Sequence, residues 1–382
     1  MKQSMKRFFK RLAIVLSIAI MLAALLQLNQ VNKPALVNTD GRSFEKATVT
    51  AILQDNVQEN GSRIGDQLVG LRLADGSEVE ANSPNGLLFG TVCKPGMPVI
   101  AMASKTGSLS SFTVYSYDRF KAVVGFLVFF CLLLMVVGGP KGIKSVLALI
   151  MTFASFLFFF FPLLMHGIAP LLAAVITACL ILALTVWLIC GSTTKALAAG
   201  MAALGGVLCA GLSAEVFGQA AHLSGYNVSN IEALLFVGQN TRIDVGQLLF
   251  AGILFASLGA VLDIAMDVSA AVYELQQMNP DKDTRMLFIS GMHVGQDVMG
   301  TMAATLILAV FGGSLGTWVL DYVYDLPFLQ LINANSLDIV IMQGLSGGIG
   351  VIMTVPLAAA CSALLARHAR ENASLPCPAE HG

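Results

Sequence analysis

The sequence predicts an all-α polytopic transmembrane helical bundle of about eight spans, with a small extracytoplasmic β domain between the first two spans. Composition gives the first indication: 56% of the 382 residues are hydrophobic and 12% are charged, whereas about 25% of a soluble domain is charged. Apolar runs give the second, because several approach the roughly 20 residues that cross a bilayer. The predicted spans are centred on residues 12–28, 120–137, 145–164, 168–190, 196–213, 245–268, 296–319 and 337–366.

Residues 1–40 are predicted to form an N-terminal membrane anchor and linker. The segment MKQSMKRFFKRLAIVLSIAIMLAALL has a basic region followed by an apolar one, which fits either an uncleaved anchor or a cleaved signal peptide. The following QLNQVNKP contains no small-x-small cleavage pattern, and this favours the anchor. Its lysines and arginines are expected to keep the N-terminus in the cytoplasm.

Residues 41–118 form the one segment between predicted spans that is long enough to fold as a soluble domain. Its runs FEKATVTAIL, QLVGLRLADGSEVEAN, GMPVIAMA and SSFTVYS are alternating or β-branched, with DG, NG and PG turn signals among them. These features predict a small β-barrel or sandwich on the extracytoplasmic side. It contains no catalytic pairing and no metal-ligand spacing, so we expect a platform or lid rather than an enzyme.

The rest of the chain is predicted to form a seven-span membrane domain over residues 119–367 and a disordered cytoplasmic tail over residues 368–382. If the N-terminus is cytoplasmic and the spans cross the membrane in succession, the C-terminus is also cytoplasmic. Arg242 is then the one basic residue in a short external loop. The basic residues then expected on the cytoplasmic side are Lys141, Lys144, Lys195, Lys282, Arg285, Arg367 and Arg370.

Charge and cysteine content exclude some classes of function. The net charge is −1, and no long basic run is present, so nucleic-acid binding has no support. The seven cysteines form no CxxC pair and suggest neither a disulfide framework nor a zinc site. We expect no cofactor. The expected partners are the lipid bilayer, a small solute or cation, and either a partner membrane subunit or further copies of the chain.

The segment LGAVLDIAMDVSAAVYE places three acids in an otherwise apolar helix. At about 100° per residue, Asp263, Asp267 and Glu274 lie within roughly 40° of one another, on the same stripe as small residues such as Gly259. Small residues let helices approach closely, and a carboxylate that faces lipid is costly. We therefore expect Asp263 to point into the bundle, whereas Glu274 is expected to reach the membrane interface.

The next two predicted helices carry similar stripes. His293 and Asp297 share a face in SGMHVGQDVMG, and Gln343 shares one with Gly347 and Gly350 in MQGLSGGIGVIM. We expect these faces to pack against one another or to surround a cavity, with the carboxyl oxygens of Asp263 and Asp297 about 4–8 Å apart. The three glycines near Gly347, followed by a proline, also permit a broken helix, although such residues are common in ordinary membrane helices.

The counter-charge of the acids defines the predicted site. A buried carboxylate must be protonated, paired or bound to a cation, and no lysine or arginine lies inside the apolar part of any membrane-domain span. His293 is the one cationic candidate, and it is better explained as a hydrogen-bonding residue than as a metal ligand. A proton or a bound cation is therefore the natural counter-charge. The predicted site consists of Asp263, Asp267, Asp297, Gln296, Gln343 and His293.

Several segments closely resemble the YibE/F-like family of bacterial polytopic membrane proteins. The resemblance is most specific in GAVLDIAMDVSAAVYELQQMNP and FISGMHVGQDVMGTMAATLILAVFGGSL, and it extends over most of residues 115–366. It implies an integral protein of the bacterial plasma membrane, in a family often treated as possible permeases. The family usually has arginine before the second aspartate, where this chain has Gln296. Loss of that arginine would leave Asp297 freer to bind a proton or cation.

Three functions remain open at this stage. The first is a proton- or cation-coupled permease for a small solute, which the acidic stripes favour. The second is a membrane scaffold whose external domain recruits a partner. In that case the acids of the stripes would have a structural role only. The third is an intramembrane aspartyl protease, in which Asp263 and Asp297 would share a proton. The protease resemblance is poor, because Gln296 and Leu357 stand where those enzymes have a glycine and the alanine of a Pro-Ala-Leu motif.

Overall fold

The computed structural model describes residues 27–31, 34, 36, 41–58, 65–84, 91–106, 109–191, 193–227, 231–279 and 283–373. They form two compact units, residues 35–137 and residues 1–34 with 138–382, and each unit is considered by itself. Most of the predicted first span, 12–28, lies outside the described residues. The predicted tail, residues 368–382, overlaps the last helix, which continues to Ala373.

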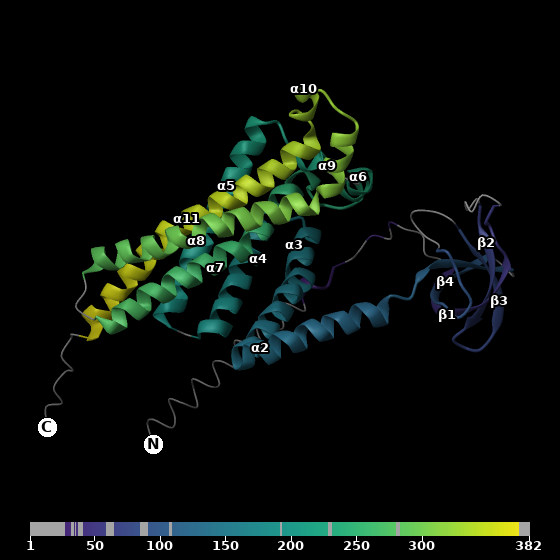
Figure 1. Ribbon diagram of the computed structural model, residues 1–382, viewed down its shortest axis with the longest axis horizontal. Helices are drawn as coiled ribbons and strands as arrows, with labels where there is room; N and C mark the ends of the chain where they lie inside the picture. Colours follow the sequence, from purple (N-terminus) through teal and green to yellow (C-terminus); the bar gives the residue numbers. More distant parts are fainter. Residues whose placement is uncertain are drawn as a thin grey trace, which may run out of the picture. The chain divides into compact units, whose positions relative to one another are not determined.

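A closed five-stranded β-barrel forms the first part of the smaller unit (Figure 1). The strands pair in the order β1-β2-β3-β5-β4, and all neighbours are antiparallel except β3 and β5. Alternating residues such as Val69 and Leu71 are fully buried inside it, as the period of a strand requires. The strands are β1 (Arg42–Gln54), β2 (Gln67–Leu73), β3 (Glu78–Ser83), β4 (Pro98–Thr106) and β5 (Leu109–Tyr117). The structure thus confirms a small N-terminal β region.

A free cysteine lies in the barrel core. The Cys93 side chain is 1% exposed, its backbone N–H donates to Gln67 Oε1 at 2.8 Å, and its Sγ donates to Ser83 Oγ at 3.4 Å. Burial raises the pKa of the Cys93 thiol, against a smaller lowering effect of the Ser83 hydrogen bond. The thiol therefore stays protonated at neutral pH, and the thiolate, which is the reactive form, is scarce.

We expect Cys93 to resist alkylation as long as the barrel is folded. Iodoacetamide applied to the native protein at neutral pH should leave Cys93 unmodified, and the same treatment in denaturant should modify it completely, because unfolding removes both the burial and the steric protection. Peptide mass spectrometry measures the two extents of modification. Equal modification in native and denatured protein would show that the thiol is accessible and would contradict the closed barrel.

Helices make up the membrane unit and the segment that leads into it. They are α2 (Phe120–Ser155), the π-helical η1 (Phe156–Phe160), α3 (Phe161–Met165), α4 (Pro170–Cys190), α5 (Thr194–Ala220), η2 (Gly225–Asn227), α6 (Ile231–Asn240), η3 (Val245–Gln247), α7 (Leu248–Met278), α8 (Thr284–Gly313), α9 (Leu315–Val323), α10 (Phe328–Leu331) and α11 (Asn335–Ala373). Among the described residues, six segments are long and apolar enough to cross a membrane: Phe120–Met165, Pro170–Cys190, Thr194–Ala220, Val245–Met278, Thr284–Gly313 and Asn335–Arg367.

The first of these six segments covers two of the predicted spans, 120–137 and 145–164. It contains 46 residues, which at 1.5 Å per residue would extend about 69 Å as a straight helix, far beyond the roughly 30 Å of a bilayer core. Gly139 interrupts it with φ 55° and ψ −136°, and Pro140 follows. The interruption falls between the two predicted spans, in the sequence GGPKG. The count of eight spans stays a prediction.

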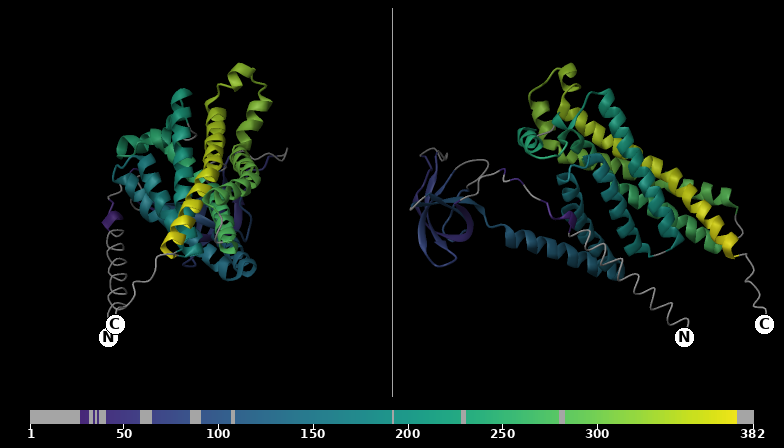
Figure 2. Two further views of the ribbon diagram at one scale, coloured as in Figure 1. Left: turned by 90° about the vertical axis from the view of Figure 1, so that its left-hand side faces the viewer. Right: turned by 180° about the vertical axis from the view of Figure 1, so that it is seen from behind.

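Helix α11 packs against α5, α7 and α8 (Figures 1 and 2). The two backbones approach closely at two facing glycines of α11 and α5: a Cβ added to Gly350 would lie 2.8 Å from Gly206 O and 2.7 Å from Ala210 Cβ. Small residues at this crossing bring the two backbones together, as is common between membrane helices.

The possible break in the last helix is absent from the structure. Gly347, Gly348 and Gly350 are all buried in a continuous α11, which also contains Pro356. A Cβ added to Gly347 would lie 2.7 Å from Leu306 Cδ2 of α8. These glycines therefore serve close packing against α5 and α8, which explains their presence without an exposed backbone.

Candidate functional site

Two of the predicted acids occupy the middle of their helices. Asp263 is the central residue of α7, with fifteen residues before it and fifteen after it in Leu248–Met278. Helix α8 begins at Thr284, twelve residues before the predicted start of that span, so thirteen residues precede Asp297 and sixteen follow it. The sequence pattern placed Asp297 near the start of its span because the first three turns of α8 are rich in polar residues. The structure moves it to midhelix.

Contacts between α7, α8 and α11 fix the relative height of the two acids. A Cβ added to Gly291 would lie 2.8 Å from Val272 Cγ2, and Ser257 and Leu306 both adjoin Gly347 of α11. Ser257 and Val272 are fifteen residues apart in α7, and Gly291 and Leu306 are fifteen residues apart in α8. The two helices are therefore antiparallel neighbours with a register that holds along their length.

This register brings three carboxylates within about one helical turn of one another in the membrane unit. Asp297 is six residues beyond Gly291 in α8, and Asp267 is five residues before Val272 in α7. Each interval corresponds to about 8–9 Å along a helix axis. Asp297 is thus nearly level with Asp267, and Asp263 lies one turn before Asp267 in α7. We call Asp263, Asp267 and Asp297 the carboxylate layer.

The carboxylate layer faces away from α11. Helix α7 reaches α11 through the opposite face, where Ser362 Oγ donates to the buried Ser269 Oγ at 3.0 Å. Helix α8 reaches α11 through Gly295, where an added Cβ would lie close to Val355. Because α11 lies behind both helices, their acidic faces point to the same side.

The prediction that Asp263 and Asp297 point into the bundle of their own chain is wrong. Asp263, Asp267 and Asp297 are all exposed in the single chain. The small residues beside them are exposed too: a Cβ added to Gly252, Gly259 or Gly300 would meet nothing within 4 Å. The small residues that do mediate close packing lie on the opposite faces of α7 and α8 and on α11. The predicted 4–8 Å between the carboxyl groups stays a prediction.

The other predicted site residues divide into two groups. His293 is exposed one turn before Asp297 on the same face of α8, and Gln296 is exposed beside it. Gln343 is half-buried on α11, four residues before Gly347. Since Gly347 adjoins Ser257, which is already six residues from Asp263, Gln343 does not reach the carboxylate layer.

The arrangement offers proton-binding groups rather than a preformed metal site. Among the residues that the structure describes, no three His, Cys, Asp or Glu side chains are grouped to hold a metal ion. No hydrogen bond joins Asp263 to Asp297 within the described part of the chain, so the proton-sharing pair of an aspartyl protease finds no support there. Single carboxylates at midhelix can take up and release protons.

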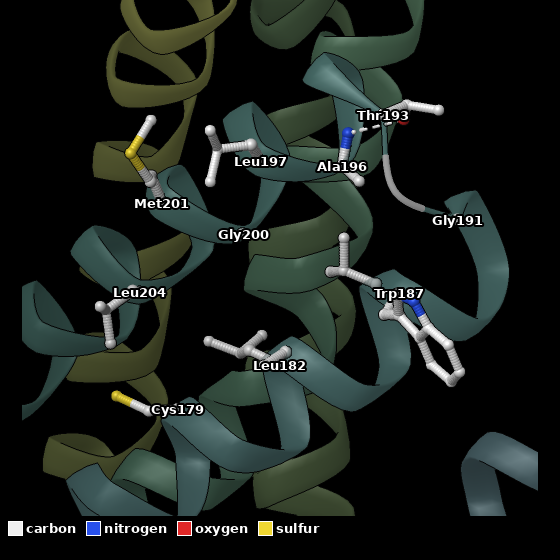
Figure 3. Close-up of a pocket in the computed structure, with 12 residues that line it drawn as sticks. Cys179, Leu182, Trp187, Gly191, Thr193, Ala196, Leu197, Gly200, Met201 and Leu204 are labelled. Atoms are coloured by element: carbon white, nitrogen blue, oxygen red, sulfur yellow. Dashed lines mark hydrogen bonds between the residues drawn. The ribbon is translucent and has the colours of Figure 1, made fainter. Parts of the chain in front are cut away.

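An apolar groove lies between α4 and α5, away from the predicted site residues (Figure 3). Its volume is about 380 Å³, and its wall includes Leu182, Trp187, Leu197 and Met201. Thr193 caps the first turn of α5 at its edge by accepting a hydrogen bond from Ala196 N at 3.1 Å. No acidic side chain lines this groove, and its surface suits a hydrocarbon chain of the surrounding lipid.

Sequence reasoning missed one polar pocket of the membrane unit. Arg242 and His166 line it together with amide side chains. The available signal was the position of Arg242 as the one basic residue in a predicted short external loop, but nothing in the sequence links that loop to His166, 76 residues earlier.

The apolar helices and the midhelix carboxylates define this chain as an α-helical integral membrane protein with ionisable groups inside its membrane-spanning segments. A family model described as YibE/F-like protein matches residues 126–368. The chain belongs to the YibE/F-like family. No curated protein and no solved structure matches it.

Proposed function

We propose that the chain is a proton-coupled permease for a small solute and that the carboxylate layer is its proton-binding site. The observation that carries this proposal is the position of Asp263 and Asp297 at the middle of two adjacent membrane helices, about one helical turn apart in level. Ionisable residues inside membrane segments are costly and typically mark ion or proton pathways.

The absence of a fixed counter-charge supports a proton as the coupling ion. Helix α7 contains no lysine or arginine, and the only one in α8 is Arg285, in its first turn. A charged carboxylate at the bilayer centre costs about 3 kcal/mol on insertion scales. Protonation removes that charge. If the carboxylates are open to only one side of the membrane at a time, they take up a proton on one side and release it on the other, which couples proton movement to solute movement.

The outward orientation of the carboxylate layer adds a structural requirement. In a bilayer the exposed face of α7 and α8 meets either lipid or another protein surface, and its open glycines allow a second helix to approach closely. We propose that a further copy of the chain or a partner membrane subunit covers this face during transport, so that protons reach the carboxylates through protein rather than through lipid.

Proton movement in reconstituted vesicles tests the proposed function. Purified protein in liposomes that contain a pH-sensitive dye should acidify or alkalinise the lumen when a transmembrane pH gradient or the correct solute is applied. Candidate solutes can be screened by the same signal. A permease produces a protein-dependent flux, whereas vesicles that behave like empty liposomes under every gradient and solute would support the scaffold function instead.

The topology that this proposal uses can be checked separately. We expect eight spans with both chain ends in the cytoplasm and the β-barrel outside. A reporter fused after Arg370 should then read as cytoplasmic, and a cysteine introduced at the exposed Gln58 should react with an impermeant maleimide in intact cells. An external C-terminus, or a cysteine at position 58 that reacts only after lysis, would contradict the span count.

A further inference from the structure

A polar pocket lies at one end of the membrane unit, where the α3–α4 turn, the α6–α7 connection and the segment before the barrel meet. Its volume is about 500 Å³. The pocket is far from the carboxylate layer, because Arg242 precedes α7 and Asp263 lies halfway along that helix. The residues that line it are Gln30, Val31, Pro34, Met165, His166, Asn240, Thr241 and Arg242.

Arg242 supplies a positive charge to this pocket. The side chain is exposed, and it forms no ion pair with any acid in the part of the chain that the structure describes. The nearby Asp244 already caps η3, where its Oδ1 accepts a hydrogen bond from Gly246 N at 3.0 Å. None of the described residues that line the pocket is acidic. The guanidinium donors are therefore available for an external anion.

The stem of Arg242 is held in place by the backbone of the α3–α4 turn. Gly167 has φ +81°, and a Cβ added there would lie 3.1 Å from Arg242 Cβ and 3.4 Å from its Cδ. Glycine adopts this left-handed conformation without strain, and the missing side chain leaves room for the arginine. Gly167 thus both forms the turn and positions the arginine stem against it.

Side-chain hydrogen bonds hold the chain segment that contributes Gln30 to the pocket. A ring nitrogen of His166, Nε2, lies 3.1 Å from Leu28 O and can donate to it, and Asn29 Nδ2 donates to Phe158 O at 2.8 Å. These two contacts attach Leu28 and Asn29 to η1 and to the residue after α3. The next residue, Gln30, lines the pocket together with Asn240 and Arg242. The pocket therefore combines one guanidinium with two amide side chains.

We propose that this pocket binds an oxyanion, specifically a phosphate group. A guanidinium presents paired N–H donors that match phosphate oxygens in a bidentate geometry. The amide of Gln30 supplies further donors, and Asn240 Nδ2, which already donates to Phe236 O at 2.8 Å, has one further N–H. The phosphate can belong to a free solute or to a phospholipid headgroup, since the pocket lies at an end of the membrane helices. This inference does not depend on the proton-coupled function.

Binding measurements on the full-length protein in detergent test the proposal, with inorganic phosphate as the free probe and isothermal titration calorimetry as the readout. We expect Arg242→Gln to weaken phosphate binding roughly tenfold or more, because a charge-assisted interaction is lost. Gly167→Ala should weaken it as well by displacing the arginine stem. Arg285→Gln removes a comparable exposed arginine from the first turn of α8 and should leave the affinity unchanged.

A second readout distinguishes the lipid source from the free one. Native mass spectrometry measures the anionic phospholipid that remains bound after purification. Selective loss of bound lipid in Arg242→Gln, with little effect of free phosphate on the wild type, assigns the pocket to a headgroup. Weaker binding of free phosphate in the variant, with unchanged lipid, assigns it to a solute. If neither free phosphate nor bound lipid differs among the wild type, Arg242→Gln and Gly167→Ala, the proposal is wrong.

Discussion

Asparagine in place of Asp263 or Asp297 is expected to reduce proton-coupled flux at least about tenfold and to remove its dependence on pH. The amide is nearly isosteric with the carboxyl group, so helix packing should be retained. It cannot take up and release a proton in the accessible pH range, and a tenfold effect corresponds to about 1.4 kcal/mol in the transport barrier. Flux in proteoliposomes, compared at equal amounts of inserted protein, measures the loss.

Glu274→Gln provides the matched control for this pair. Glu274 lies on the same exposed stripe of α7, but only four residues before the helix ends at Met278, where a long side chain can reach the membrane interface. Its removal should leave pH-dependent flux near the wild-type level. If Asp263→Asn and Asp297→Asn both retain full, pH-responsive flux, the acids have a structural role and the scaffold becomes the better-supported function.

Alanine at Gly206 is expected to destabilise the membrane unit by about 3 kcal/mol or more, at the upper end of overpacking effects. An added Cβ would overlap Thr354 Oγ1 and would lie 2.9 Å from Val261 Cγ1 and 3.0 Å from Gly350 O. The Thr354 hydroxyl has little freedom to move, because it donates to Gly350 O at 2.7 Å and the residue is fully buried. Thermal unfolding of the purified protein in detergent measures the effect.

Gly259→Ala is the corresponding control on α7. It adds the same methyl group where nothing lies within 4 Å, and alanine favours a helix over glycine by about 1 kcal/mol. Its Tm should therefore equal or exceed that of the wild type. The double variant Gly206→Ala/Thr354→Ala should recover part of the lost stability. Equal Tm values for Gly206→Ala and Gly259→Ala would show that α5 and α11 do not cross at these glycines.

The helices could be predicted from the sequence because their apolar runs are long and well separated. The run that became α4, for example, was expected at 168–190 and extends over Pro170–Cys190. The β region was recognisable from alternation and turn signals. Boundaries were less accurate in α8, where polar residues such as His293 and Asp297 lie within the helix and lower its local hydropathy. Length and apolarity alone could not show that Asp297 is at midhelix.

The sequence could also identify which residues share a face, but it could not identify which face is buried. In α7 the acidic stripe carries Gly252 and Gly259, and the opposite face carries Ser257 and Ser269, so both faces are rich in small residues. The cost of a charged group in lipid favoured burial of the stripe. The structure instead buries the serine face, because that face meets α11, and the carboxylates stay exposed in the single chain.

Infrared difference spectroscopy on the purified, reconstituted protein tests most directly whether the carboxylate layer binds protons. Spectra recorded across a pH titration report the C=O stretch of protonated carboxylic acids, which is resolved from the band of the carboxylate. The predicted result is a component of the pH-dependent C=O band that is lost in Asp263→Asn or Asp297→Asn and persists in Glu274→Gln. A titration spectrum that is identical in the wild type and both asparagine variants would contradict a proton site in the carboxylate layer.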